Sequence, residues 1–276
     1  MEVRVASQAA PGRAANEDGA VVVGDLVAVF DGVTHPADLH NGCMHTPAWY
    51  VRRLTAQLVG AYGEAPDAAL PDLLARAIEA VSDEHRGTCD LSHPGTPAAT
   101  ACVLRAGGDH VDYLVLCDSP LLLDVGDRTD VVKDTRFERI ANLRRAASVP
   151  GTGHVERLTA AASHKWEYIN QPDGYWIAAA DPRAAHEAVI GSAPLRGPGH
   201  VRRAALLTDG ASAAVEQFDL FGWARLLDLA ATAGPAELIR RVRAAECADQ
   251  HGHVRTRYKR HDDATAAVCL FEGNPG

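Results

Sequence analysis

The sequence predicts an α+β protein built on antiparallel β-sheets. Short apolar runs occur in pairs that are joined by turns containing glycine, which is typical of β-hairpins. Stretches with helical periodicity lie in pairs between these hairpins instead of after every strand, so a parallel βαβ sheet is disfavoured. The 276 residues contain no repeat, no low-complexity linker and no break in composition. We therefore expect a single domain that covers residues 1–276.

The strand pattern begins with an alternating run at 3–6, and Gly24-Asp25 joins the apolar runs 20–24 and 26–30 into a tight hairpin. Further strands are expected at 98–105, 111–116, 121–125, 131–132, 174–179, 201–208 and 264–270. Thr46-Pro47, a capping residue followed by proline, predicts the start of the first helix. Helices are expected at 47–62, 69–86, 217–232 and 235–248, with a short one after Asp181-Pro182 and two weaker patterns within 134–176.

Acidic residues stand at the ends of five expected strands. They are Glu17, Asp18, Asp31, Asp118, Asp209, Asp262 and Asp263. The hairpin brings the Glu17-Asp18 end close to Asp31, because its strands run in opposite directions. A single Asp-Gly pair is ordinary turn chemistry, but five acidic strand ends together favour a site for hard divalent cations such as Mg²⁺ or Mn²⁺. Two such ions would activate a water and hold a phosphoryl group.

These acidic ends also form a series of motifs. In chain order the series reads Arg13-x-x-Asn16-Glu17-Asp18, Phe30-Asp31-Gly32-Val33, Cys117-Asp118-Ser119, Leu207-Thr208-Asp209-Gly210 and Asp262-Asp263-Ala264-Thr265. It resembles the metal-dependent protein phosphatases of the protein phosphatase 2C type, in particular their bacterial branch. Each motif alone is weak, but the five in order, over roughly residues 3–272, are strong. The resemblance implies a four-layer α-β-β-α sandwich, in which helices flank two central antiparallel sheets.

The resemblance also implies a role for each matching residue. Asp31 would bridge two Mn²⁺ or Mg²⁺ ions, Asp209 and Asp262 would complete one ion site, and the Gly32 carbonyl would serve the other. Glu17 or Asp18 would hold metal-bound water, and Asp118 would hold a third, weaker ion. Arg13 would bind the substrate phosphate, which suits the fork geometry of a guanidinium group. Asp263 would support the ligands without binding metal itself.

Two segments depart from the family pattern. After Asp31-Gly32 the chain continues with Val33-Thr34-His35-Pro36, and His35 is a candidate general acid because imidazole titrates near neutral pH. The alternative is a loop histidine that the following proline holds in place. The second departure is Cys117-Asp118-Ser119-Pro120, where the family has glycine before the aspartate and arginine after the serine.

The function that follows is hydrolysis of a phosphomonoester, with phosphoserine or phosphothreonine in proteins as the expected substrate. The same chemistry on a small phosphate ester remains open, and so does a catalytically weak phosphatase-like binding module. The region 134–176 matches a variable flap beside the family's active site, and its arginines at 136, 139, 144 and 145 either face a phosphorylated substrate or form a solvated helix face. No P-loop pattern is present, which disfavours a P-loop kinase.

Charge and composition exclude several other classes. The net charge is −9, from 36 acidic and 27 basic residues, which argues against nonspecific nucleic-acid binding. No apolar run approaches the roughly 20 residues of a membrane span, and no signal peptide is evident. The six cysteines form no C-x-x-C pair, so we expect thiols and a cytoplasmic location. Scarce lysine suggests the composition of a GC-rich bacterial genome, and the oligomeric state stays open.

One segment invites comparison with a soft metal site. His40-Asn41-Gly42-Cys43-Met44-His45 contains two histidines and one cysteine. Because this spacing matches no regular zinc pattern, the sequence does not predict a zinc site there.

Overall fold

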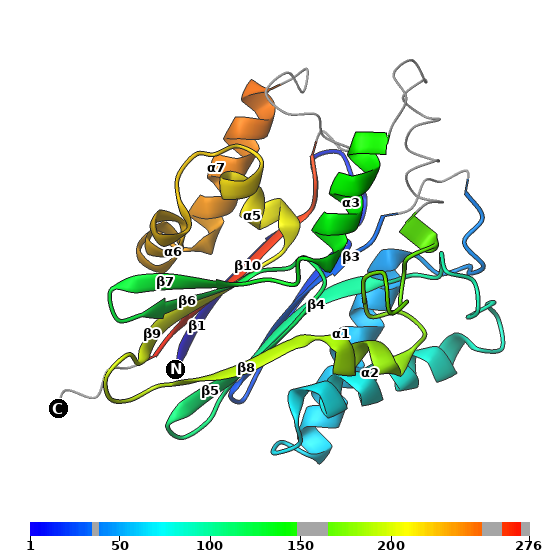
Figure 1. Ribbon diagram of the computed structural model, residues 1–276, viewed down its shortest axis with the longest axis horizontal. Helices are drawn as coiled ribbons and strands as arrows, with labels where there is room; N and C mark the ends of the chain where they lie inside the picture. Colours follow the sequence, from blue (N-terminus) through cyan, green and yellow to red (C-terminus); the bar gives the residue numbers. More distant parts are fainter. Residues whose placement is uncertain (35–38, 148–164, 250–260, 272–276) are drawn as a thin grey trace.

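Two antiparallel sheets lie at the centre of the molecule, and helices cover both outer faces (Figure 1). The computed structural model describes residues 1–34, 39–147, 165–249 and 261–271. This is the layered α+β architecture that the sequence and its family resemblance predict.

Each sheet has five strands, and every neighbouring pair is antiparallel. The first sheet has the order β1 (Glu2–Gln8), β10 (Ala264–Leu270), β9 (Val201–Leu207), β6 (Leu121–Val125) and β7 (Arg128–Val132). The second has the order β2 (Asp18–Val23), β3 (Leu26–Gly32), β4 (Ala99–Ala106), β5 (His110–Leu116) and β8 (Val189–Pro194). Four of its strands form two hairpins, β2–β3 and β4–β5, and local sequence patterns predict hairpins well.

The helices divide between the two outer faces. The second sheet is covered by α1 (Pro47–Glu64) and α2 (Leu70–His85), and a short 3-10 helix, η1 (Pro182–Glu187), packs on α2. The first sheet is covered by α5 (Asp209–Glu216), α6 (Trp223–Thr232) and α7 (Pro235–Ala248). A further helix, α3 (Arg136–Ala147), follows β7. The start of α1 is capped as predicted, since the Thr46 hydroxyl accepts a hydrogen bond from the Trp49 amide at 3.2 Å.

Three separate apolar clusters fill the spaces between the four layers. In β3, Leu26, Ala28 and Phe30 pack toward α1 and α2, whereas Val27 and Val29 pack toward the other sheet. All five side chains are fully buried, because strand residues alternate between faces and both faces of β3 are covered. The third cluster lies between the first sheet and α5–α7. These clusters are the packing that the expected α-β-β-α sandwich requires.

Two expectations about local structure are wrong, and two elements were not predicted. Residues 174–179 form only isolated bridges, through Tyr175 and Ala178, and pack as an apolar loop instead of a strand. The second sheet instead gains β8, whose alternating burial we did not predict. The helix expected at 217–232 begins only at Trp223, as α6, and a separate helix that we did not predict, α5, covers Asp209–Glu216. The pattern at 155–169 lies largely outside the described residues.

No helix in the described part of the chain combines the length and the apolar character that crossing a membrane requires.

Candidate metal centre

The β2–β3 hairpin places two carboxylates opposite each other at its open end. Asp18, the first residue of β2, pairs in register with Asp31 of β3. On the other side of Asp31, Thr100 of β4 is its partner in the ladder. This register follows from the tight turn at Gly24, and it fulfils the expectation that the hairpin joins these acidic ends.

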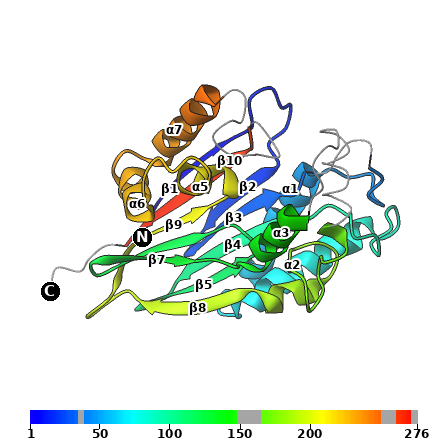
Figure 2. The ribbon, with the colours of Figure 1, turned by 45° about the horizontal axis from the view of Figure 1, so that its top comes forward.

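The first sheet lies against this hairpin, with β10 next to β2 and β3 (Figure 2). Asp209 follows β9, and Asp262 precedes β10. Two hydrogen bonds cross between the sheets: the Thr208 hydroxyl donates to Asp18 Oδ2 at 2.9 Å, and the Asp209 amide donates to Asp31 Oδ2 at 3.4 Å. We call Asp18, Asp31, Asp209 and Asp262 the acidic centre.

The carboxylates of the acidic centre destabilise one another's charged forms. Burial is the largest effect that raises the pKa of Asp31 above its usual range, and the charges of Asp209, Asp18 and Asp262 raise it further. Burial likewise raises the pKa of Asp18, and Asp209 adds to this shift, whereas hydrogen bonds from Thr265 and Thr208 oppose it. Such a cluster of negative charge is stabilised when a cation lies among its oxygens.

The donor set fits a hard divalent cation. Asp18 Oδ1 is buried and has no hydrogen-bond partner among the described residues, so one carboxylate oxygen is available as a ligand. The four side chains of the acidic centre offer only oxygen, which Mg²⁺ and Mn²⁺ prefer. The residues therefore suit the ions that the sequence predicts.

The raised pKa values predict how stability depends on pH when chelator removes all metal. A carboxyl group whose folded pKa exceeds the unfolded value of about 3.9 binds more protons in the folded state. The free energy of unfolding therefore falls as the pH rises from about 4 toward the raised pKa values. Urea unfolding of chelated protein between pH 4.5 and 7.5 should show this fall. Asp18→Asn should make the slope shallower, and an unchanged slope would contradict the shifts.

Arg13 and Glu17 meet at the rim of the acidic centre. Arg13 Nη1 donates to Glu17 Oε2 at 2.8 Å, and the Thr34 hydroxyl donates to the same oxygen. Arg13 Nη1 also contacts Thr34 Oγ1 at 3.4 Å. The side chain of Arg13 is one-third exposed, so the guanidinium stays accessible from solvent. Thr34 was missed from the sequence, because nothing in a lone loop threonine distinguishes it.

Asp263 supports the neighbouring loop through both of its carboxylate oxygens. Its Oδ1 accepts a hydrogen bond from the Ala10 amide at 2.6 Å, and its Oδ2 accepts one from the Glu17 amide at 2.7 Å. Both oxygens are therefore used on backbone groups that flank Arg13. Thr208 is a second supporting residue, and sequence reasoning missed it. A threonine before Asp-Gly reads as a helix N-cap, but here its hydroxyl binds Asp18 across the sheets.

The glycines of the two Asp-Gly pairs are needed for close packing and do not form turns, which corrects the turn interpretation of these pairs. Gly32 is the last residue of β3, and a Cβ there would lie 2.5 Å from the Glu17 carbonyl oxygen. Gly210 lies in the first turn of α5, and a Cβ there would lie 1.9 Å from the Asp263 carbonyl oxygen. Metal binding by the Gly32 carbonyl stays a prediction.

Asp118 lies just after the end of β5. Burial raises its pKa, a hydrogen bond with Cys117 and the charge of Lys165 lower it, and Asp134 raises it. Neither Asp31 nor Asp209 is among these influences. The next residue, Ser119, is linked to Thr100 by a 2.5 Å hydrogen bond, one strand away from Asp31. A third ion at Asp118 therefore stays a prediction.

The backbone at Cys117 explains why the resembled family has glycine there. Cys117 has a φ of 66°, in the left-handed region that favours glycine. Its side chain is buried against Ala98 and Tyr175, so apolar packing offsets the backbone strain. Lys165 is close enough to influence Asp118 and belongs to the region expected to act as a flap.

Two expectations fall partly or wholly outside the described residues. His35 lies in 35–38, so its role as a general acid stays a prediction. Of the flap-like region, α3 is described, and its Arg136 binds Asp134 at 2.7 Å and the Glu187 carbonyl oxygen at 2.5 Å. Arg136 thus serves the fold, while the side chains of Arg144 and Arg145 are outside the described set.

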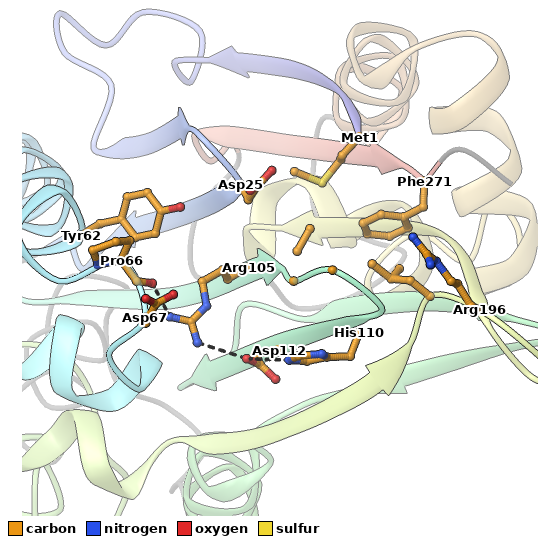
Figure 3. A pocket seen from close by; sticks show the side chains of 14 residues that line it. Met1, Asp25, Tyr62, Pro66, Asp67, Arg105, His110, Asp112, Arg196 and Phe271 are labelled. Atoms are coloured by element: carbon orange, nitrogen blue, oxygen red, sulfur yellow. Dashed lines mark hydrogen bonds and ion pairs between the residues drawn. The ribbon is translucent and has the colours of Figure 1, made fainter. Parts of the chain in front are cut away.

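A surface pocket lies at the other end of the sandwich (Figure 3). It is lined by Asp25 of the β2–β3 turn, whereas Asp18 and Asp31 lie at the opposite end of these strands. Arg105 lines the pocket and donates hydrogen bonds to Asp112 at 3.1 Å and to the Pro66 carbonyl oxygen at 2.7 Å. These bonds tie β4 to β5 and to the loop after α1, which is a structural role.

Comparisons with known proteins show the fold. No protein-family model and no curated protein matches the chain. Among solved structures, the catalytic domain of the serine/threonine protein phosphatase PstP, in complex with 2 manganese ions, is 16% identical, with a TM-score of 0.57 and coverage of 97% of this chain and 96% of that one. The phosphatase Stp1 from Staphylococcus aureus is 12% identical, with a TM-score of 0.59 and coverage of 99% and 96%.

A third solved structure is the PPM Ser-Thr phosphatase MsPP from Mycobacterium smegmatis, in complex with cacodylate. It is 19% identical, with a TM-score of 0.55 and coverage of 99% of both chains. These likenesses extend over nearly the whole chain. The protein therefore has the fold of the metal-dependent serine/threonine phosphatases, with a group of carboxylates gathered at one end of the sandwich.

Proposed function

We propose that this protein is a metal-dependent phosphomonoester hydrolase that acts on phosphoserine or phosphothreonine in proteins, and that residues 1–276 form one catalytic domain. The observation that carries the proposal is the meeting of Asp18, Asp31, Asp209 and Asp262 between two sheets. It is supported by the fold, which is shared with protein phosphatases, one of them in complex with 2 manganese ions.

The acidic centre would hold two Mn²⁺ or Mg²⁺ ions. Asp31 is central, because the charges of the three other carboxylates act on it. Asp209 and Asp262 reach it from the first sheet, and Asp18, with its unpartnered Oδ1, reaches it from β2. Asp18 is better placed as a ligand than Glu17, whose carboxylate binds Arg13 and Thr34. When bound, the ions supply an acidified water and positive charge beside the phosphoryl oxygens.

Arg13 would bind and orient the phosphate. Its fork matches phosphate oxygens, and Glu17 holds it at the rim of the acidic centre. We expect Arg13→Lys to lower kcat/KM about 10–100-fold, since a lost charge-assisted hydrogen bond is worth about 1.5–3 kcal/mol. The matched control is Arg240→Ala, which removes an exposed arginine that pairs with Glu237 on α7 and should leave kcat/KM unchanged. Equal kinetics for the two variants would contradict the role.

The proposed function is tested by hydrolysis of p-nitrophenyl phosphate with Mn²⁺, with Mg²⁺ and with chelator. Release of p-nitrophenol that requires metal and is lost in Asp209→Asn would support the proposed function. A panel of phosphopeptides and small phosphate esters then separates protein phosphatase from metabolite phosphatase by kcat/KM. Absence of both hydrolysis and metal binding would overturn the proposal and leave a phosphatase-like binding module.

A cytoplasmic location in a bacterium is part of the same proposal. All six cysteines are free thiols, although Cys43 and Cys89 lie close together and several thiols are partly or fully exposed. Proteins of oxidising compartments tend to convert such pairs into disulfides. The solved structures with this fold named above include phosphatases of Staphylococcus aureus and Mycobacterium smegmatis.

A further inference from the structure

A second group of potential ligands lies away from the acidic centre, where the start of α1 meets the end of α2. Cys43 and His45 precede α1, His85 is the last residue of α2, and Cys89 follows in the next turn. One ligand atom from each residue lies within 4.8 Å of all the others. We call these four residues the thiol–imidazole cluster. Two thiols and two imidazoles make up a common ligand set of structural zinc.

Three sulfur–nitrogen distances in the cluster are close to those of a tetrahedral zinc shell. Cys43 Sγ lies 3.4 Å from His45 Nδ1 and 3.5 Å from His85 Nδ1, and Cys89 Sγ lies 3.4 Å from His45 Nδ1. Around a tetrahedral zinc ion, with bonds of about 2.3 Å to sulfur and about 2.05 Å to nitrogen, each S···N edge is about 3.6 Å. The cluster therefore needs little movement to close on an ion.

The backbone around the cluster is arranged to hold it. The His45 amide donates to Cys43 Sγ at 3.4 Å, which orients this sulfur within the cluster. The Asp90 amide donates to the Gly42 carbonyl oxygen at 2.8 Å, which joins the two ligand-bearing segments directly. Gly42 has a φ of +75°, and a Cβ there would lie 2.5 Å from His93 Cβ, so glycine is required for this approach.

The imidazoles are packed in fixed orientations. The rings of His45 and Trp49 stack with centroids 3.9 Å apart, and the ring of His85 lies 5.1 Å from that of Trp49. His85 is only 1% exposed, and its Nε2 has no hydrogen-bond partner among the described residues. Its other nitrogen, Nδ1, lies 3.5 Å from Cys43 Sγ. Nδ1 is therefore the nitrogen that is placed to bind an ion, while Nε2 would keep the proton of the neutral ring.

We propose that Cys43, His45, His85 and Cys89 form a structural zinc site that is distinct from the acidic centre. Four protein ligands close the shell and leave no position for a substrate, so the ion would stabilise the fold without taking part in catalysis. Soft sulfur ligands select zinc over the Mg²⁺ or Mn²⁺ that the carboxylates favour. The two centres would thus hold different metals in one chain.

The site would fix the start of α1 against the end of α2. This matters for the acidic centre because the residue after Thr46, Pro47, packs on Gly32: a Cβ on Gly32 would lie 3.2 Å from Pro47 Cβ. The metal would therefore anchor the far end of the loop that leaves Asp31-Gly32. The sequence did not reveal it, because Cys43 and His85 are 42 positions apart and the pattern Cys-x-His…His-x-x-x-Cys is irregular.

The test is the metal content of the full-length protein after exhaustive dialysis against a weak chelator. We expect about one zinc per chain by elemental analysis, as for a closed four-ligand site. Cys43→Ser and Cys89→Ser should each lower the retained zinc about 10-fold or more. The matched control, Cys247→Ser, removes an exposed thiol on α7 and should retain full zinc, as should Asp31→Asn, which alters only the acidic centre.

Cobalt substitution makes the test independent of how well the variants fold. Unmutated protein reconstituted with Co²⁺ should show the intense visible bands of tetrahedral cobalt and thiolate-to-cobalt charge transfer, which oxygen ligands do not produce. Absence of these bands together with absence of zinc would overturn the proposal. So would a Cys43–Cys89 disulfide, identified by peptide mapping of the unreduced protein, because it would occupy the cluster. Zinc that is lost with Asp31→Asn instead would also overturn it.

Discussion

Asp31→Asn is expected to abolish metal-dependent hydrolysis while making the metal-free protein more stable. Asp31 stands between the carboxylates of both sheets, so its loss removes a ligand shared by the two proposed ions. We expect kcat to fall about 10³-fold or more, since charge stabilisation by bound cations is the main source of rate in this chemistry. Hydrolysis of p-nitrophenyl phosphate at saturating Mn²⁺ measures the loss.

The gain in stability follows from the charges of the acidic centre. Burial and neighbouring carboxylates raise the pKa of Asp31, so its charged form is unfavourable in the folded protein without metal. A neutral amide of the same shape removes this repulsion, and we expect about 1 kcal/mol or more of added stability in chelator at pH 7.5. With Mn²⁺ present the unmutated protein should be more stable than Asp31→Asn, because only the unmutated protein gains stability from the bound ions.

Asp112→Asn is the matched control for this prediction. Asp112 is an aspartate of β5 that pairs with Arg105 near the other end of the sandwich. Its loss should leave kcat unchanged and cost at most about 1 kcal/mol, as is usual for partly exposed ion pairs. If Asp31→Asn destabilised the chelated protein as Asp112→Asn does, the repulsion within the acidic centre would be contradicted. If Asp31→Asn kept a tenth of the activity, the acidic centre would not be the catalytic site.

The parts of the molecule that the sequence predicts are those set by neighbouring residues. The pairing of Asp18 with Asp31 needs only a two-residue turn and alternating apolar residues, so it can be read directly. The two contacts that cross between the sheets, Thr208 to Asp18 and Asp209 to Asp31, depend on how the layers dock. No local pattern contains that information, and only the order of the motifs suggested it.

The errors have the same origin. The strand β8 was missed because its alternation is weak, with glycine, serine and alanine among its six residues, and pairing with β5 decides its conformation. The apolar run 174–179 has strong strand propensity, yet it packs as a loop on Ala98 and Cys117. The thiol–imidazole cluster was missed because each half of it looks like an ordinary loop until α1 and α2 pack side by side.

Gly210→Ala is expected to disrupt the acidic centre without touching a carboxylate. In an exposed helix this substitution usually stabilises by about 0.5–1 kcal/mol, because alanine has the better helix propensity. At position 210 the added Cβ would lie 1.9 Å from the Asp263 carbonyl oxygen, so backbone must move. We expect a loss of about 3 kcal/mol, the cost of severe overpacking, measured by urea unfolding.

The movement should also weaken metal binding, because the Asp263 carbonyl belongs to the segment that carries Asp262. Calorimetric titration of Gly210→Ala with Mn²⁺ should show lower affinity, and hydrolysis should fall with it. Gly60→Ala is the control. Gly60 lies on the exposed face of α1, where an added Cβ would meet no neighbouring atom of the described residues within 4 Å. The same substitution should therefore stabilise slightly there and leave Mn²⁺ affinity unchanged.

If Gly210→Ala lowers the free energy of unfolding and Gly60→Ala raises it, the close approach between α5 and the start of β10 requires the glycine of Asp209-Gly210. Equal effects at both positions would mean that the two segments can separate without cost, and that the acidic centre tolerates looser packing than its contacts indicate.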